Sequence, residues 1–237
     1  MADSNEALKI RPERSSRIRV RRVPERAVYD RDAIYAVLDA GLLCHVGYQI
    51  DGQPYVTPTS YWREGDVLYW HGSSASRMLR HLAEGTSVCV TVTHLDGLVL
   101  ARSGFHHTVN YRSVMALGIA TPLANDERKI AALKNFMERL FPGRWDEVRP
   151  PTNLELKATT VLTMKLDEVS AKIRNAPPTS DEADYLLPCW AGVIPLGLDA
   201  RVPVADPKRL KDEPIPSYAE TINRRFAISL PHPLRTD

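Results

Sequence analysis

Residues 69–77, with the sequence YWHGSSASR, combine the side chains best suited to hold an anion. An apolar strand pattern ends at Trp70, the chain turns through small polar residues, and a helical pattern begins at Ser76. The first amides of a helix lack partners inside the helix and carry partial positive charge, so they attract anions. Hydroxyl groups can donate to a phosphate, and a guanidinium can hold it through two parallel hydrogen bonds. The phosphate-binding candidates are Ser73, Ser74, Ser76 and Arg77.

The residues of this turn leave two interpretations open. The turn lacks the Lys-Ser/Thr pair of a nucleotide P-loop, which argues against a nucleoside triphosphate. A Ser-capped surface helix followed by an exposed arginine would have the same sequence. The turn alone does not separate a phosphate site from such a helix.

Histidines offer a second kind of chemistry. His71 ends the expected strand directly before the turn, and an imidazole exchanges a proton near neutral pH, so His71 is the candidate proton donor or substrate contact. A hydrogen-bonded structural histidine is the alternative, and it is the interpretation that we prefer for His45. His106 and His107 are adjacent, and neighbouring residues of a strand point to opposite faces, so they would not chelate one ion together. No third ligand has a suitable spacing, so we predict no metal site.

The elements that position these residues are mainly short strands. Asp30 is expected to cap a helix that ends before Gly41. Asp51-Gly52 and Glu64-Gly65 are turn signals that join three strands into an antiparallel meander. The remaining patterns predict helices over 76–83 and 125–140, strands over 42–50, 55–62, 67–70, 87–93, 97–102, 109–120 and 159–166, a short edge strand over 18–23, and a short element over 190–196.

This pattern predicts a mainly β protein with a few helices, folded as a closed or split β-barrel. There are too few helices between the strands for a doubly wound sheet, and the chain has no GxGxxG motif. With 237 residues, 43% of them hydrophobic and 25% charged, the chain can form one sizeable domain with extensions.

Composition also bears on location. No apolar run approaches the roughly 18 residues of a membrane span, and the charged N-terminus lacks the apolar core of a secretory signal. Cys44, Cys89 and Cys189 lie among apolar residues at wide spacing, and we interpret them as reduced core thiols. We therefore expect a cytoplasmic protein.

A basic segment spans residues 9–26. One interpretation is an arm for nucleic acid or another anionic partner, and the other is a solvated or partner-clasping tail. No aromatic residue stands between the arginines to stack on a base, which favours the tail and argues against nucleic acid. The basic residues are Lys9, Arg11, Arg14, Arg17, Arg19, Arg21, Arg22 and Arg26.

Residues 52–61, with the sequence GQPYVTPTSY, precede the phosphate turn by one strand. Together the two segments resemble the FMN-binding split-barrel superfamily, and within it the pyridoxamine 5'-phosphate oxidase-related proteins that include the nitroimidazole-resistance flavoproteins. In those proteins a GxPYxxP strand is followed by a YxHxx strand end and a Ser/Gly-rich turn into a helix. The resemblance covers residues 23–166 and returns at 190–196.

The resemblance implies where an FMN would lie. Its phosphate would sit at the turn of Ser73, Ser74, Ser76 and Arg77, with Met78 closing over it. Its ring would lie along the second strand of the meander, where backbone groups near the pyrimidine end stabilise negative charge on the reduced flavin. Pro58 has no N–H, so the backbone donor must come from a neighbour. The ring-binding strand residues are Thr57, Pro58, Thr59, Ser60 and Tyr61.

The resemblance also implies a homodimer with the flavin at its interface. Tyr111, Arg112 and Ser113 match the strand that reaches the flavin from the second subunit, with Arg112 facing the phosphate or ring edge and Tyr111 covering the flavin. For Arg112 the alternative is an ion pair with a nearby carboxylate. In the nitroimidazole-resistance proteins a histidine matching His71 approaches the flavin and the substrate. Met78 stands where a basic residue follows Arg77 in true pyridoxamine phosphate oxidases, which argues against pyridoxamine phosphate as the substrate.

We therefore predict an FMN-dependent oxidoreductase acting on a small organic molecule, with NAD(P)H as a candidate electron donor. The alternatives are a non-catalytic flavin-carrying or flavin-sensing protein, and a split barrel that binds haem or a deazaflavin. The predicted organisation is a basic arm (1–22), an FMN-binding split-barrel domain (23–170) and a Pro-rich extension (171–237) that packs on the barrel or on the partner subunit.

Overall fold

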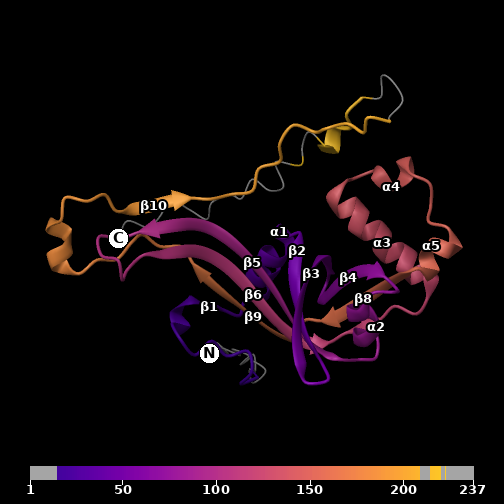
Figure 1. Ribbon diagram of the computed structural model, residues 1–237, viewed down its shortest axis with the longest axis horizontal. Helices are drawn as coiled ribbons and strands as arrows, with labels where there is room; N and C mark the ends of the chain where they lie inside the picture. Colours follow the sequence, from indigo (N-terminus) through magenta and orange to yellow (C-terminus); the bar gives the residue numbers. More distant parts are fainter. Residues whose placement is uncertain (1–14, 209–213, 220–221, 223–237) are drawn as a thin grey trace, which may run out of the picture.

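The computed structural model describes residues 15–208, 214–219 and 222, so most of the predicted basic arm lies outside the described residues. The fold is mainly antiparallel β-sheet with a few helices (Figure 1). Strands follow the order β1-β9-β6-β5-β2-β3-β4-β8-β7, and β10 pairs with β5 beside this path. The path has two ends, so the sheet is not closed, and of the two predicted barrels the split one is confirmed. The strands are β1 (Ala27–Val28), β2 (Leu43–Ile50), β3 (Gln53–Glu64), β4 (Val67–Ser73), β5 (Ser87–Leu100), β6 (Thr108–Ile119), β7 (Thr121–Pro122), β8 (Thr159–Lys165), β9 (Glu168–Arg174) and β10 (Gly192–Pro195).

The predicted meander is confirmed as β2, β3 and β4, which pair antiparallel in sequence order. The first hairpin turns at Asp51 and Gly52, whose φ values are 49° and 81°. Two positive φ values in succession are what a two-residue hairpin turn requires, and Asp and Gly tolerate them. This tight turn sets the register that places Thr57 opposite Val46 and Thr59 opposite Cys44.

Strands β5 and β6 form a long hairpin that projects away from the meander, with β10 alongside (Figure 1). We refer to β10 and the hairpin end from Leu95 to Asn110 as the arm. The prediction of two strands, 87–93 and 97–102, was wrong, because the chain continues through a bulge between Leu95 and Gly97 as one strand. Gly97 permits close approach of β10, since a Cβ there would lie 3.0 Å from Val193 Cγ1 and 3.1 Å from the Ile194 carbonyl oxygen.

Three of the helices begin at side-chain caps that the sequence indicated. Asp30 accepts from the Ala33 amide, Ser76 from the Leu79 amide and Asn125 from the Arg128 amide. The two short helices were not predicted, although α5 opens with a complete capping box of Thr152 and Glu155. The helices are α1 (Arg31–Ala40), α2 (Arg77–Leu82), α3 (Asp126–Leu140), α4 (Arg144–Glu147) and α5 (Asn153–Lys157).

Helix α3 is fixed to the barrel by Asp39 at the end of α1. Arg139 of α3 donates from Nη2 to the Asp39 carbonyl oxygen at 2.7 Å and from Nη1 to its carboxylate at 3.1 Å. Arg63 of β3 donates from Nε to the same carboxylate at 3.0 Å. One carboxylate therefore joins three elements of the fold.

Two apolar clusters hold the sheet together. The larger fills the barrel and includes Trp70, Met78 and Leu79, and the smaller lies between α3 and the outer face of β3 and β4, around Trp62 and Val161. Tryptophan residues 62 and 70 are both almost fully buried, on opposite faces of paired strands. Side chains of β4 thus alternate between the barrel interior and the space beneath α3.

Several predictions about the ends of the fold were wrong. Residues 18–23 form no strand, because Val23 has a left-handed φ of 56° and Pro24 begins a 3₁₀ helix. Cys189 is exposed, so only Cys44 is a buried core thiol and Cys89 is half-buried. In the predicted element over 190–196, Trp190 lies over Gly192 and is 65% exposed.

Strand β9 runs across the proposed division between residues 170 and 171, and β10 adds a strand from the Pro-rich extension to the sheet. No helix within the described residues is both long enough and apolar enough to cross a membrane.

Candidate functional site

The candidate site lies where β3 and β4 part. Residues 53–60 of β3 pair with β2, whereas β4 pairs with β3 only from Tyr61 to Glu64. Beyond Trp70, strand β4 continues beside β8 alone. No described strand pairs with residues 53–60 on the side away from β2, so the backbone N–H and C=O groups that point to this side are free of ladder hydrogen bonds. We call this opening the split.

The turn after β4 forms one end of the split, and its own hydrogen bonds make it rigid. The Ser74 amide donates to the Ala158 carbonyl oxygen at 2.8 Å, the Ser76 amide to the Ser73 carbonyl oxygen at 2.9 Å, and the Ala75 amide to Ser73 Oγ at 3.2 Å. The hydroxyls of Ser73 and Ser76 act as acceptors in these local bonds, so their hydrogens remain available to a ligand.

The next two amides, of Arg77 and Met78, form no hydrogen bond within the described chain, and they open α2. They are the free donors that a phosphate at this turn would use. The Met78 side chain, in contrast, is buried in the barrel core. The expectation that it closes over a phosphate was wrong, because core packing directs it away from the turn.

Arg77 connects the turn to the strand across the split. Its guanidinium carbon lies 4.4 Å from the centroid of the Tyr55 ring, and it forms no ion pair within the described residues. Tyr55 stacks in turn on Tyr48, whose hydroxyl lies 3.2 Å from Thr57 Oγ1. An exposed guanidinium without a carboxylate partner, held beside free amides, is suited to an anion.

The residues of the predicted ring-binding strand differ in the chemical groups that they can present to a ligand. Thr57, Thr59 and Ser60 are half-buried and can present backbone or hydroxyl groups, and Pro58 is exposed and has no N–H. The Tyr61 side chain is buried in the core, where its hydroxyl donates to the Leu38 carbonyl oxygen and burial raises the pKa of the phenol. Only the Tyr61 backbone is therefore near the split.

His71 follows Trp70, the last residue of β4 that pairs with β3, so it stands at the point where the two strands diverge. Its ring lies 5.8 Å from the Trp62 ring and 5.1 Å from the Phe136 ring, measured between centroids and both edge-on, so it faces α3. Nδ1 is buried without a hydrogen-bond partner, while Nε2 is neither buried nor bonded within the described chain. Burial lowers the pKa of His71, so the imidazole is neutral at neutral pH.

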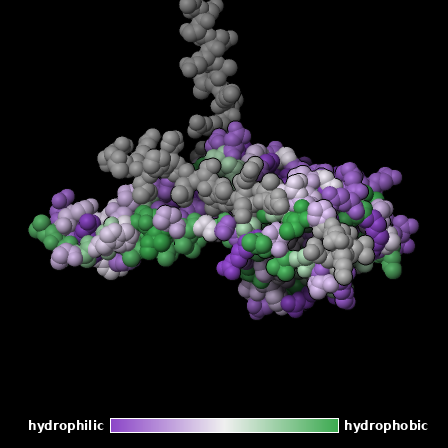
Figure 2. All heavy atoms as spheres, turned by 90° about the horizontal axis from the view of Figure 1, so that it is seen from above, coloured by the Kyte–Doolittle hydropathy of each residue, from purple (hydrophilic) through white to green (hydrophobic). Residues whose placement is uncertain are grey.

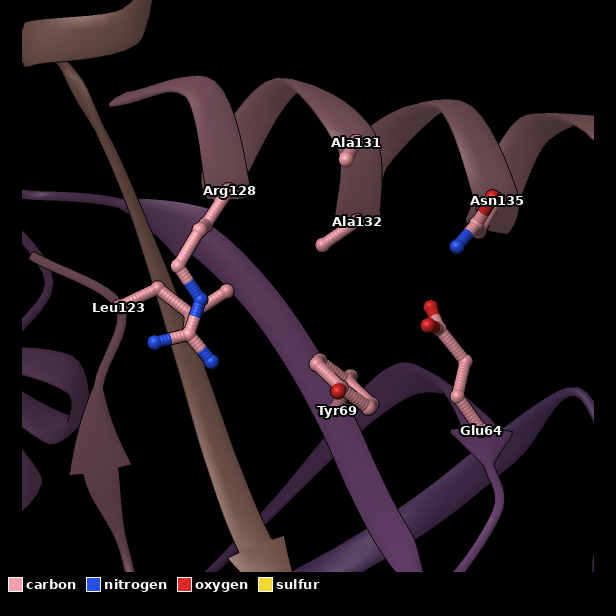
Figure 3. A pocket seen from close by; sticks show the side chains of 7 residues that line it. All are labelled: Glu64, Tyr69, Leu123, Arg128, Ala131, Ala132 and Asn135. Carbon is pink, nitrogen blue, oxygen red and sulfur yellow. The ribbon is translucent and has the colours of Figure 1, made fainter. Parts of the chain in front are cut away.

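A small pocket lies beneath α3 on the same face of β4 as His71 (Figure 3). In Figure 3 the Tyr69 ring forms its floor, with Arg128 at one end and Glu64 opposite Asn135 at the other. Its volume is about 160 Å³, below the roughly 300–1,000 Å³ of pockets for drug-sized ligands. The pocket is therefore too small to contain a flavin or a porphyrin.

Tyr111, Arg112 and Ser113 are not brought to the split of the same chain, because β5, β2 and β3 separate β6 from β4 in the sheet. Arg112 forms a two-bond ion pair with Asp96, at 2.9 and 2.8 Å, which was the alternative considered for it. Ser113 donates to the Lys172 carbonyl oxygen at 3.2 Å. A contribution of these residues to a flavin requires a second copy of the chain and stays a prediction.

Two features escaped the sequence interpretation. Trp62 and Phe136 flank His71, and although helical spacing placed Phe136 on the apolar stripe of α3, that pattern does not say which strand the stripe covers. His106 and His107 lie in the loop before β6 rather than in a strand, so the reason given against chelation was wrong. No group of three metal-ligating side chains is present among the described residues.

Comparisons with known proteins identify the family of the chain. Residues 30–173 match the family model described as pyridoxamine 5'-phosphate oxidase. The structure is similar to the flavocytochrome Anf3 from Azotobacter vinelandii, with 44% identity, a TM-score of 0.83, and coverage of 87% of this chain and 96% of that one. It is similar to the FAD and haem binding protein from Mycobacterium smegmatis, with 34% identity, a TM-score of 0.80, and coverage of 84% and 97%.

A more distant structure, a 5-nitroimidazole antibiotic resistance protein from Bacteroides thetaiotaomicron VPI-5482, has 22% identity, a TM-score of 0.51 and coverage of 62% of this chain and 86% of that one. That likeness concerns the fold alone. None of the curated protein sequences matches the chain. The family model covers more than half of the chain, and it matches the region that contains the split, the phosphate turn and His71. The chain is a member of the pyridoxamine 5'-phosphate oxidase family.

Proposed function

We propose that this protein is a flavin-dependent redox protein that binds its flavin in the split and carries a haem as a second group. The proposal is carried by one observation: among the described residues, the edge of residues 53–60 lacks a strand partner and faces a turn whose Arg77 and Met78 amides and Arg77 guanidinium have no hydrogen-bond or ion-pair partner. A planar heterocycle with a phosphate-bearing tail needs both features. The flavin, when bound, supplies the electron-transfer chemistry.

The residues of this chain bind and orient the flavin. The amides of Arg77 and Met78, with the hydroxyls of Ser73, Ser74 and Ser76, hold the phosphate, and Arg77 balances its charge. Backbone groups of Thr57, Thr59 and Ser60 meet the polar edge of the ring. These contacts serve FMN and FAD alike, because both carry a phosphate at the end of the ribityl chain. The relative from Mycobacterium smegmatis is described as binding FAD, so we place FAD before FMN.

A second copy of the chain would complete the site. Apolar side chains on the outer face of the sheet are strongly exposed: Leu43 58%, Val56 68%, Leu95 48% and Ile119 58%. Figure 2 shows further hydrophobic atoms exposed along the arm. Apolar exposure of this extent is typical of an interface. We propose a homodimer in which this face is covered and Tyr111 and Arg112 approach the partner's flavin.

Haem enters the proposal through two relatives. The chain is 44% identical to a flavocytochrome and 34% identical to a protein that binds FAD and haem.

The absorption spectrum of the purified protein tests the proposal. Flavin bands together with a Soret band are expected, and mass analysis of the denatured sample identifies FAD or FMN. Bleaching of the flavin bands by NAD(P)H would mark NAD(P)H as the electron donor, whereas a flavin that only dithionite reduces would favour a carrier or sensor. A colourless protein that takes up neither FAD nor FMN would contradict the proposal.

A further inference from the structure

The C-terminal extension is rich in exposed apolar side chains. Among the described residues, nine of the 17 exposed large apolar side chains lie from Tyr185 onward. That stretch supplies less than a fifth of the described residues. Single exposed apolar side chains are common on a protein surface, whereas a concentration of them marks a surface that a partner covers.

The sequence of this stretch alternates between apolar residues and other types over residues 194–204, which we call the clasp. Strict alternation places the apolar side chains on one side of an extended chain, as in a strand with one buried face. Yet β10 ends at Pro195, and all residues from 201 to 208 are exposed, Val204 by 96%. The clasp therefore has the pattern of a half-buried strand, but its own chain does not cover it. Its apolar residues are Ile194, Leu196, Leu198, Ala200, Val202 and Val204.

The apolar side of the clasp continues the outer face that the proposed homodimer covers. Register places Ile194 opposite Leu98, and both side chains are exposed. Leu98 pairs with Val109, and Tyr111, two residues further along β6, pairs with Leu95. Paired residues share a face of the sheet, and so do residues two apart on one strand. Ile194 and Leu98 therefore lie on the same face as Leu95, so one apolar surface runs from the outer face along the arm into the clasp.

The extension is held to its own subunit on both sides of the clasp. On the arm, the Leu196 amide donates to the Asp96 carbonyl oxygen at 3.0 Å. Beyond the clasp, the Tyr218 hydroxyl donates to the Glu147 carboxylate of α4 at 3.0 Å. Figure 1 shows the chain leaving the arm after β10 and running toward α4. A segment held in this way presents its apolar side at a defined place, which lowers the entropic cost of binding a partner.

We infer that the clasp binds the partner subunit, with Leu198, Val202 and Val204 packed on the partner's apolar surface. The inference rests on the homodimer proposed above. The sequence left two surfaces open for the extension, its own barrel and the partner, and the exposure of residues 201–208 argues against the first. A second copy is the occupant because the clasp is continuous with the proposed dimer face. Two-fold symmetry forms each contact twice, so both clasps become covered together.

Photo-crosslinking in the full-length, flavin-loaded protein tests which chain the clasp contacts. p-Benzoylphenylalanine replaces Val204 in one sample and, as the matched control, Leu154 of α5, which is 77% exposed. Irradiation and denaturing gel electrophoresis should give a covalent dimer for position 204 and none for position 154. Crosslinks at position 204 that stay within one chain, or that capture a different protein, would overturn the inference.

Charge in the clasp tests its contribution to the dimer. The double change Val202→Glu and Val204→Glu alters the net charge by the same amount as the control, Lys208→Glu. Since burial of one such side chain is worth about a factor of ten or more, the double variant should raise the dimer dissociation constant at least about 100-fold. Lys208→Glu should keep the wild-type constant. Sedimentation over a dilution series measures the constants, and circular dichroism should show an unchanged fold because both valines are exposed in the single chain.

The two proposals fail in different ways. A double variant that dimerises as tightly as the wild type would refute the clasp and leave the homodimer in place. A wild-type protein that is monomeric at every concentration would refute the homodimer itself.

Discussion

The guanidinium of Arg77 lies 4.4 Å from the centre of the Tyr55 ring, so the phosphate turn and the free strand edge are joined across the split. This contact orients a side chain that pairs with no carboxylate within the described residues. Arginine over an aromatic ring keeps its five N–H groups available at the ring's rim. The pair therefore forms a preformed anion site beside a strand that can receive a planar ring.

Replacing Arg77 by alanine should weaken flavin binding by about 1.5–3 kcal/mol, the range for a hydrogen bond to a charged group. Arg80→Ala is the matched control, because Arg80 is exposed on the same helix one turn later. Fluorescence titration of the apoprotein with FAD and with FMN gives the two dissociation constants. Equal losses in both variants would show that Arg77 acts only through the general positive field.

The exposed apolar side chains on the outer face of the sheet predict a homodimer, and charged substitutions on this face should dissociate it. The double change Leu43→Glu and Val56→Glu places two like charges per subunit on a face that we expect to be covered, so it should shift the protein to a monomer and reduce its flavin content. Light scattering after gel filtration measures the mass. Leu154→Glu, on α5 at a residue 77% exposed, is the control that should remain dimeric. A wild-type monomer that retains its flavin would show that one chain suffices.

Burial of His71 predicts a pH dependence of stability. Its pKa is lowered in the folded state from the ordinary value of 6.5, so the unfolded chain binds a proton more readily. Stability is therefore complete above about pH 6.5 and decreases as the pH falls toward the lower folded pKa. Urea denaturation of the apoprotein between pH 7.5 and pH 5 should show this decrease, and His71→Phe should reduce its slope. The remaining slope is expected to include His94, whose pKa burial also lowers. A slope that His71→Phe leaves unchanged would assign the whole effect to other groups.

Removal of the Asp39 carboxylate should loosen α3. Asp39→Asn keeps the size of the side chain but leaves the half-buried Arg63 and Arg139 without a counter-charge, which should lower the free energy of unfolding by about 1–3 kcal/mol. Glu155→Gln disturbs the exposed pair with Arg149 and should have little effect. Denaturant titration compares the two variants, and equal losses would mean that Asp39 is no more than a surface charge.

Local patterns were sufficient to predict most of the elements around the split. Asp51-Gly52 fixed the first hairpin, Ser76 marked the start of α2, and the apolar stripe of α3 was visible in its spacing. Elements without a turn signal, a capping residue or a clear period were missed. Strand β9 follows β8 after only Leu166 and Asp167, and α4 has four residues, too few to show a period.

The sequence was sufficient to predict which residues form the candidate site, but not which way their side chains point. Whether the Met78 side chain faces the turn or the core depends on how α2 packs against β4. Whether the His71 side chain faces the turn or α3 depends on which residues of β4 point to each face of the sheet. Both are tertiary relationships that no local spacing encodes. The Arg112–Asp96 pair likewise depends on the bulge that shifts the register after Leu95.

The most direct measurement of the central claim is a crystal structure of the protein grown with its flavin. The account predicts a phosphate within about 3 Å of the Arg77 guanidinium and of the Met78 amide, with the ring along Thr57 to Ser60. A flavin bound elsewhere, or a split filled by the protein's own side chains, would contradict it.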